Sequence, residues 1–274
     1  MSGRLTANDA GTAGAERSAT PAPGRPAGVV VPRVLGVAAI LGAWEFASGR
    51  LVNDFWISRP TLIGERLWEL AISGDLWWHA SATGWQALLG LLLGLVVGVA
   101  FGVAFAALPR LAEALDPLVM ALYSVPRIAF APLFIIWFGI GLFSKVMMAF
   151  SMAVFVILLN THQGLKEVDK DLLDLVQSMR ASRWYRFSRV QFPAVLPWIF
   201  GGIRIAIGLA LIGSVLGELL GSNRGLGWYV ERAGGTLDTT GVFAGLVALM
   251  ALAIIANESV RVLERAIGVG RSGA

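Results

Sequence analysis

The sequence predicts an all-α membrane protein with about six transmembrane helices, on three observations. Of its 274 residues, 56% are hydrophobic and only 15% are charged, whereas a soluble domain carries about 25% charged residues. Glycine is frequent, with 33 residues. Uncharged stretches recur at the length of about 20 residues that a helix needs to cross a bilayer. The composition excludes a disordered chain and, with no cysteine, a disulfide scaffold or a zinc–cysteine site.

The first 28 residues are small and polar, and they include Arg4, Arg17 and Arg25. Such a segment cannot bury a core, and no small-residue cleavage site follows it, so we predict a disordered cytoplasmic tail that is retained. The transmembrane domain is expected over residues 29–265. Residues 266–274 are expected to form a second cytoplasmic tail.

Six apolar stretches supply the predicted spans. The first is the weakest because it contains Glu45, and the third is interrupted by Pro126, Arg127 and Pro132, which predicts two segments or a kinked helix. Asn160 and Thr161 are expected to extend the fourth. The spans are Val34–Gly49, Ala87–Leu108, Pro117–Phe143, Val146–Leu159, Trp198–Gly221 and Thr239–Ala256.

The distribution of basic residues predicts which ends of these helices face the cytoplasm. With both termini inside, the inner segments hold fourteen Lys and Arg residues and the outer segments hold six. Cytoplasmic loops carry the excess of Lys and Arg in membrane proteins. The net charge of +4 is therefore assigned to inner loops, and no nucleic-acid partner is expected.

The outer segment 50–83 is rich in tryptophan, and its residues 62–72 have the spacing of a short amphipathic helix. Tryptophan prefers the headgroup region, so an interfacial helix is the favoured interpretation. A tryptophan cage for substrate is the alternative.

Glycines recur every four residues in two spans, which places a smooth strip on one face of each helix. Such strips allow close helix packing where lipid supplies no hydrophobic drive. A sliding interface in a moving transporter is the alternative function. The glycines are Gly90, Gly94, Gly98 and Gly102 in the second span, and Gly213, Gly217 and Gly221 in the fifth.

Residues 164–197 form the longest charged inner loop between spans. Apolar residues at helical spacing predict a first short helix that begins at Asp169 or Asp171, and Ser182 can cap a second. Pro193 and Pro197 are then expected to break the helix before the fifth span. On these residues alone, an interfacial helix pair held by anionic lipid explains the loop.

This loop resembles the "EAA" loop of permease subunits of binding-protein-dependent ABC importers. The family pattern is Glu-Ala-Ala, three residues, Gly, nine residues, Ile, one residue, Leu-Pro. The matching positions are Asp174-Leu175-Val176, Ala181-Ser182-Arg183, Val190, Phe192-Pro193 and Leu196-Pro197. The resemblance covers residues 60–265 and includes SVPRIAFAPLFIIWFGIG at 124–141, GGIRIAIG at 201–208, Glu218 and RGLGWYV at 224–230. These stretches resemble the group that imports nitrate, taurine and aliphatic sulfonates.

The resemblance implies a type I ABC importer permease fold in a bacterial inner membrane. It also implies a homodimer, two cytoplasmic ABC ATPases and an extracytoplasmic substrate-binding protein. The loop would couple to the ATPase through Asp174, Arg180, Ala181, Ser182, Arg183 and Phe187. The chain has no phosphate-loop motif, so we expect no catalytic residues, no bound metal or cofactor, and ATP with Mg²⁺ on the partner ATPase.

One residue departs from the family pattern. Arg180 stands where the motif has glycine, which allows a turn between two short helices. Because arginine disfavours a left-handed turn, the joint is expected to be either more regular or strained.

Polar residues inside the spans are the candidates for a pathway or gate, because such groups are costly in lipid. They are Arg127, Asn160, Arg204 and Glu218. For Arg204 a structural or gating role is favoured, and for Glu218 a gate or ion-pair role. Internal pairing is favoured for Glu45 and Glu258.

Other classes of protein remain open at this point. An ABC permease for a pyrimidine-type or other small organic nutrient is the main alternative, followed by an ion-driven secondary transporter, which would need inverted repeats. An intramembrane enzyme is disfavoured because every Asp lies in a loop or tail and no His-Glu-x-x-His or Gly-x-Ser-x-Gly motif occurs. A structural anchor does not explain the length of the family resemblance.

Overall fold

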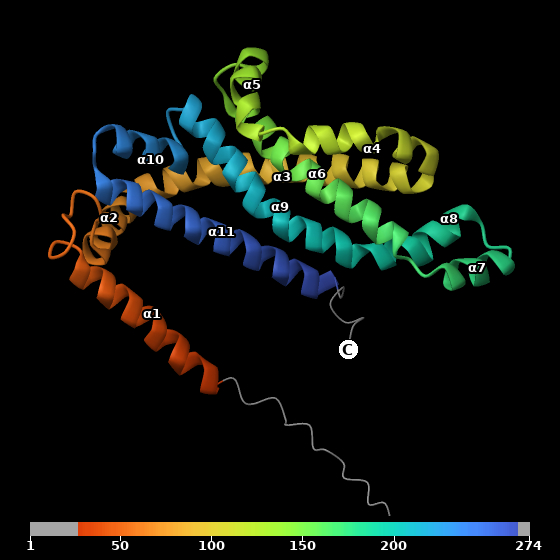
Figure 1. The fold of residues 1–274 in the computed structure, drawn as a ribbon, viewed down its shortest axis with the longest axis horizontal. Coiled ribbons are helices and arrows are strands. Elements are labelled where there is room, and N and C mark those ends of the chain that lie inside the picture. Colours follow the sequence, from red (N-terminus) through yellow and green to blue (C-terminus); the bar gives the residue numbers. More distant parts are fainter. Residues whose placement is uncertain (1–26, 268–274) are drawn as a thin grey trace, which may run out of the picture. The chain divides into compact units, whose positions relative to one another are not determined.

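The computed structural model describes residues 27–267, so the predicted tails fall almost wholly outside the described residues. The described chain consists of helices and turns, apart from one isolated bridge between Ser48 and Val52 (Figure 1). It divides into a unit that ends at Phe46 and a unit that begins at Ala47. The elements are α1 (Ala27–Ala47), α2 (Pro60–Ser73), α3 (Asp75–Ala107), α4 (Pro109–Ser124), η1 (Arg127–Phe130), α5 (Ala131–Phe138), α6 (Leu142–Lys166), α7 (Lys170–Ser178), α8 (Arg183–Arg186), η2 (Phe187–Gln191), α9 (Phe192–Leu220), α10 (Leu226–Gly235) and α11 (Thr239–Ile267).

Within the described residues, four helices are long and apolar enough to cross a membrane: α3, α6, the continuous helix Arg183–Leu220, and α11. A bent helix pair raises this number to five. The predicted first span lies almost entirely within α1, and its crossing of the membrane stays a prediction. Asn160 and Thr161 lie inside α6, as expected.

The predicted break in the third span is confirmed. Helix α4 ends at Ser124, and the chain turns by 86° before it continues through η1 and α5. Val125 precedes Pro126 and adopts an extended conformation with ψ 131°, as a residue before proline prefers. Pro132 lies in the first turn of α5, where its missing N–H costs nothing.

Helices α3, α6 and α9 pack together and form the core (Figure 1). The predicted glycine strip on α3 is buried against α6 at all four positions. On α9, Gly213 lies against the backbone of Ala149 and Gly217 lies against Lys145, both on α6. The prediction of close packing is confirmed, and the sliding interface stays a prediction.

The expected helix break at Pro193 and Pro197 is wrong. Both prolines lie inside α9, and the helix runs on from Arg183 through a wider π turn at Phe187–Gln191. In this turn Phe192 N–H donates to the carbonyl of Phe187, five residues back. The wider turn changes the hydrogen-bonding register just before Pro193, which has no N–H to donate.

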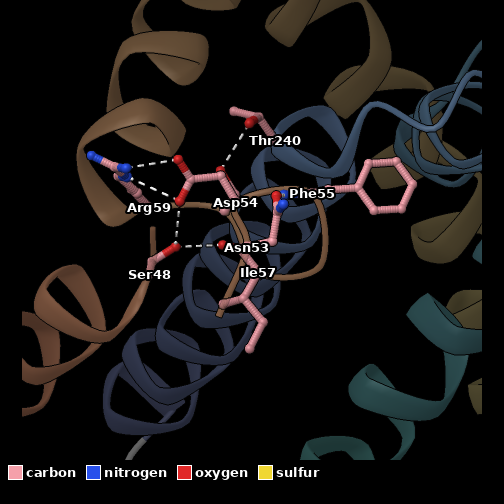
Figure 2. A network of polar contacts seen from close by, with 8 residues as sticks. Ser48, Asn53, Asp54, Phe55, Ile57, Arg59 and Thr240 are labelled. Atoms are coloured by element: carbon pink, nitrogen blue, oxygen red, sulfur yellow. Dashed lines mark hydrogen bonds and ion pairs between the residues drawn. The ribbon is translucent and has the colours of Figure 1, made fainter. Parts of the chain in front are cut away.

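A polar network fixes the loop before α2 to the start of α11 (Figure 2). Asp54 pairs with Arg59 at 2.7 Å, and Ser48 also donates to Asp54. Ser58 bonds Thr240 at 2.8 Å. The hydrogen bond from Arg59 holds the pKa of the Asp54 carboxyl below its ordinary value.

The predicted amphipathic helix in the outer segment is α2, and a second ion pair anchors it. Arg66 on α2 donates a hydrogen bond at 2.6 Å to Asp238, which lies in the turn between α10 and α11. Burial alone would raise the pKa of Asp238, but hydrogen bonds from Gly241 N–H and Arg66 hold it below its ordinary value. The segment 48–73 is therefore linked to the α10–α11 turn and the start of α11 by the Arg66–Asp238 ion pair and the Ser58–Thr240 hydrogen bond.

Candidate functional site

The loop between α6 and α9 forms two short capped helices. Asp169 caps α7 by accepting a hydrogen bond from Asp171 N–H at 2.8 Å. Ser182 caps α8 by accepting from Tyr185 N–H at 3.1 Å. Arg186 donates to Gln177 at 2.7 Å and links the two helices. The caps predicted at Asp169 and Ser182 are present, so the segment is a defined structure.

The surface of this helix pair is apolar at several exposed positions. Met179 and Trp184 are 75% and 74% exposed, and Leu175 and Tyr185 are more than half exposed. Of the six proposed coupling residues, Asp174, Arg180, Ser182 and Arg183 are also exposed, whereas Ala181 and Phe187 are half-buried. Exposed aromatic and apolar side chains ringed by charge are typical of a protein–protein interface.

Arg180 occupies the joint between the two helices in a left-handed conformation. Its φ is +56°, and its N–H donates to Gln177 O at 2.9 Å. Of the two expected outcomes, the joint is therefore the strained one. The backbone keeps the turn that glycine makes in the family pattern, at an energetic cost of about 1 kcal/mol for a residue with a Cβ.

Removing this strain is expected to stabilise the joint. Arg180→Gly relieves the strain and removes the charge, whereas Arg180→Ala removes only the charge. We expect the Gly variant to be more stable locally by about 1 kcal/mol, measured as slower amide hydrogen exchange over residues 176–183. Equal exchange in the two variants would refute the strain.

Glu218 is buried near the C-terminal end of α9, where it is 1% exposed. Its carboxylate accepts hydrogen bonds from Thr83 Oγ1 at 2.8 Å and from Gly227 N–H at 2.7 Å. Thr83 Oγ1 in turn accepts from Leu226 N–H at 2.8 Å. Gly225 N–H donates to His79 Nδ1 at 3.1 Å. Glu218 therefore holds the loop before α10 rather than forming the ion pair that was considered for it.

The other three pathway candidates form their hydrogen bonds with groups other than Glu218. Arg127 donates to the carbonyls of Leu122, Val125 and Ser151 at the α4 break. Asn160 donates to Val156 O one turn back, and Arg204 pairs with Glu264 on α11. Glu258 pairs with Arg261, as expected.

Sequence reasoning missed Lys145, His79 and Thr83. Lys145 precedes the predicted fourth span, but it lies in the first turn of α6 and is 4% exposed. A charge directly beside a long apolar run was the only indication of it in the sequence. Among residues 27–267, no group of three or more His, Asp or Glu side chains has the arrangement of a metal site.

A bundle of membrane-length helices that presents a capped, exposed helix pair at one end is the architecture of a membrane subunit that binds a partner protein. The family model described as "Binding-protein-dependent transport system inner membrane component" matches residues 90–269. The chain belongs to this family, and it is a permease subunit of an ABC importer. Membership implies an ATPase and a substrate-binding protein as partners, and location in a membrane.

Two relatives and one solved structure illustrate the similarity. The riboflavin transport system permease protein of Chloroflexus aurantiacus is 40% identical over 77% of this chain and 79% of the relative. The putative aliphatic sulfonates transport permease protein of Bacillus subtilis is 33% identical over 83% of each. An inward-facing MetNI methionine ABC transporter matches with a TM-score of 0.58 at 21% identity, over 72% of this chain and 95% of that chain, and supports the type I fold.

Proposed function

We propose that this chain forms, as a homodimer, the translocation pathway for a small anionic solute of the sulfonate, taurine or nitrate type. An extracytoplasmic binding protein delivers the solute, and two cytoplasmic ATPases drive the transport. Both termini are cytoplasmic in this arrangement. The chain itself catalyses no reaction and binds no cofactor, because ATP and Mg²⁺ bind on the ATPase.

The capped helix pair α7–α8 carries this proposal. Its exposed apolar side chains need a protein partner, and its helices are braced by the Arg186–Gln177 hydrogen bond. The helix continues from α8 through η2 into α9 without a break. A force applied to α8 by an ATPase would therefore pass directly into a membrane-spanning helix of the core.

The relatives named above support two substrate classes. A sulfonate is an anion, whereas the ring system of riboflavin is neutral. An importer of a small neutral nutrient is therefore the second candidate function, favoured by the relative with 40% identity. Uptake assays in vesicles that contain the permease, the ATPase and the binding protein, with labelled methanesulfonate and riboflavin, distinguish the two.

Coupling is tested by removing single groups from the helix pair. Ser182→Ala removes the α8 cap, which contributes about 1 kcal/mol, and Asp174→Asn removes one exposed carboxylate. We expect each variant to lower the ATPase activity of the reconstituted complex about fivefold. Glu231→Gln, which removes an exposed carboxylate on α10, is the matched control and should have no effect.

Two outcomes contradict the proposal. An ATPase activity that is unaffected by the Asp174 and Ser182 substitutions would exclude α7–α8 as the coupling site. A native mass that corresponds to a single permease chain with its ATPase would exclude the homodimer.

A further inference from the structure

A cavity of about 460 Å³ with several polar side chains in its wall lies at the end of α6 that is opposite to the coupling segment. The 25 residues of α6 separate the two ends by about 38 Å, so the cavity lies on the outer side. Its polar side chains come from α3, from α6 and from the loop after α9. They are Gln86, Lys145, Ser222, Asn223 and Arg224.

Lys145 brings a buried positive charge to the cavity wall. Its Nζ donates to Gly141 O at 3.0 Å and to Gly221 O at 2.8 Å. An ammonium group has three donors, so one N–H remains. No carboxylate within the described residues lies at ion-pair distance from Lys145; Glu218 attracts it at longer range and makes its own hydrogen bonds to Thr83 and Gly227. A buried ammonium group in this state favours a negative group in the cavity.

Arg224 adds a second cation. Its guanidinium carbon lies 4.7 Å from the centre of the Trp78 ring, which positions the group through a cation–π contact. The described carboxylates form no ion pair with it either. Arginine has a planar fork of donors that matches the oxygens of an oxoanion.

The remaining wall also favours negative charge. Gln86 Oε1 accepts from Ser214 at 2.9 Å, which leaves the Gln86 amide NH₂ as a donor. Gly141 and Leu142 place the start of α6 at the cavity, where backbone N–H groups have no partner within the helix. No acidic side chain lines the cavity.

We propose that this cavity is an anion-binding subsite at the outer mouth of the translocation pathway, where Lys145 and Arg224 bind a small oxoanion such as a sulfonate or nitrate group. The inference rests on the proposed function for its role in transport. It also separates the two substrate classes, since a neutral nutrient lacks the negative charge that the two cations attract.

Binding to the permease–ATPase complex without its binding protein tests this assignment. The probes are methanesulfonate and its uncharged analogue methanesulfonamide, titrated by calorimetry in lipid nanodiscs. We expect Lys145→Gln, which keeps donors for the two carbonyls, and Arg224→Gln each to weaken methanesulfonate binding about tenfold. Lys145→Arg and Arg224→Lys keep the charge and should bind within about threefold of the unmodified complex.

Arg261→Gln is the matched control, because it removes an exposed cation at the other end of the bundle and should leave binding unchanged. Thermal unfolding verifies that Lys145→Gln folds, and Arg224, which is only half-buried, gives an independent variant if it does not. Unchanged binding in both Gln variants, equal binding of methanesulfonamide, or no methanesulfonate binding at all would overturn the assignment.

Uptake measured with all subunits present separates this inference from the proposed function. If a sulfonate is taken up in an ATP-dependent manner but its binding does not depend on Lys145 and Arg224, the subsite is refuted and the proposed function stands. If anion binding depends on both cations but no anion is taken up, the proposed substrate class is refuted and the subsite stands.

Discussion

Gly225→Ala is expected to prevent the end of the permease where α9 leads into α10 from folding. Gly225 has φ +121°, and a Cβ at this position would lie 2.2 Å from the buried Glu218 carboxylate. The clash cannot be relieved by rotating Glu218 away, because Thr83 and Gly227 would then lose their hydrogen bonds in a buried site. Backbone strain and the lost bonds together cost about 3 kcal/mol or more. Size-exclusion chromatography in detergent and the midpoint of thermal unfolding measure the loss.

Gly235→Ala is the matched control, because a Cβ there meets no atom within 4 Å. It should give the yield and unfolding midpoint of the unmodified protein. Glu218→Gln should have an unfolding midpoint between these two. The amide oxygen of Gln can accept one of the hydrogen bonds from Gly227 N–H and Thr83, but the NH₂ cannot accept the other. A Gly225→Ala protein with normal yield and midpoint, or normal transport by Glu218→Gln, would disprove the role given to this carboxylate.

The features predicted correctly from sequence depend on residues that are near one another in the chain. Ser182 accepts a hydrogen bond from the N–H three residues later, and Pro126 restricts the backbone conformation of the residue before it. Both features could therefore be recognised without knowledge of the fold. The glycines on α3 repeat every four residues and share one face by helix geometry alone. Their partner helix, α6, could not be identified in this way.

The features missed depend on contacts between distant residues. Thr83 and Glu218 are 135 positions apart, and His79 and Gly225 are 146 apart. Neither Thr83 nor His79 has a local pattern that distinguishes it from a helix residue facing lipid. The π turn was missed for another reason, because proline was expected to end the helix and the wider turn that accommodates it has no residue signature.

Steric crowding along α3 predicts a graded loss of helix packing. A Cβ on Gly90 would lie 2.4 Å from Ala149 Cβ and 2.8 Å from two backbone atoms of α6, which cannot rotate away. A Cβ on Gly94 would lie 3.1 Å from Ala153 Cβ, and one on Gly84 would meet only Leu252 at 3.8 Å. We expect Gly90→Ala to destabilise the bundle by about 1–3 kcal/mol, Gly94→Ala by less, and Gly84→Ala not at all. The midpoint of thermal unfolding in one detergent measures all three.

Gly84→Ala is the internal control because it makes the same chemical change on the same helix. It separates steric crowding from the general gain in helix propensity of alanine over glycine, which is about 1 kcal/mol and favours all three variants equally. The larger Gly94→Leu should lose assembly altogether, since a leucine side chain at this position meets Val154 N as well as Ala153. Equal midpoints for Gly90→Ala and Gly84→Ala would contradict the packing role of the glycine strip. Normal assembly and transport by Gly94→Leu would exclude both close packing and a sliding interface as the role of the strip.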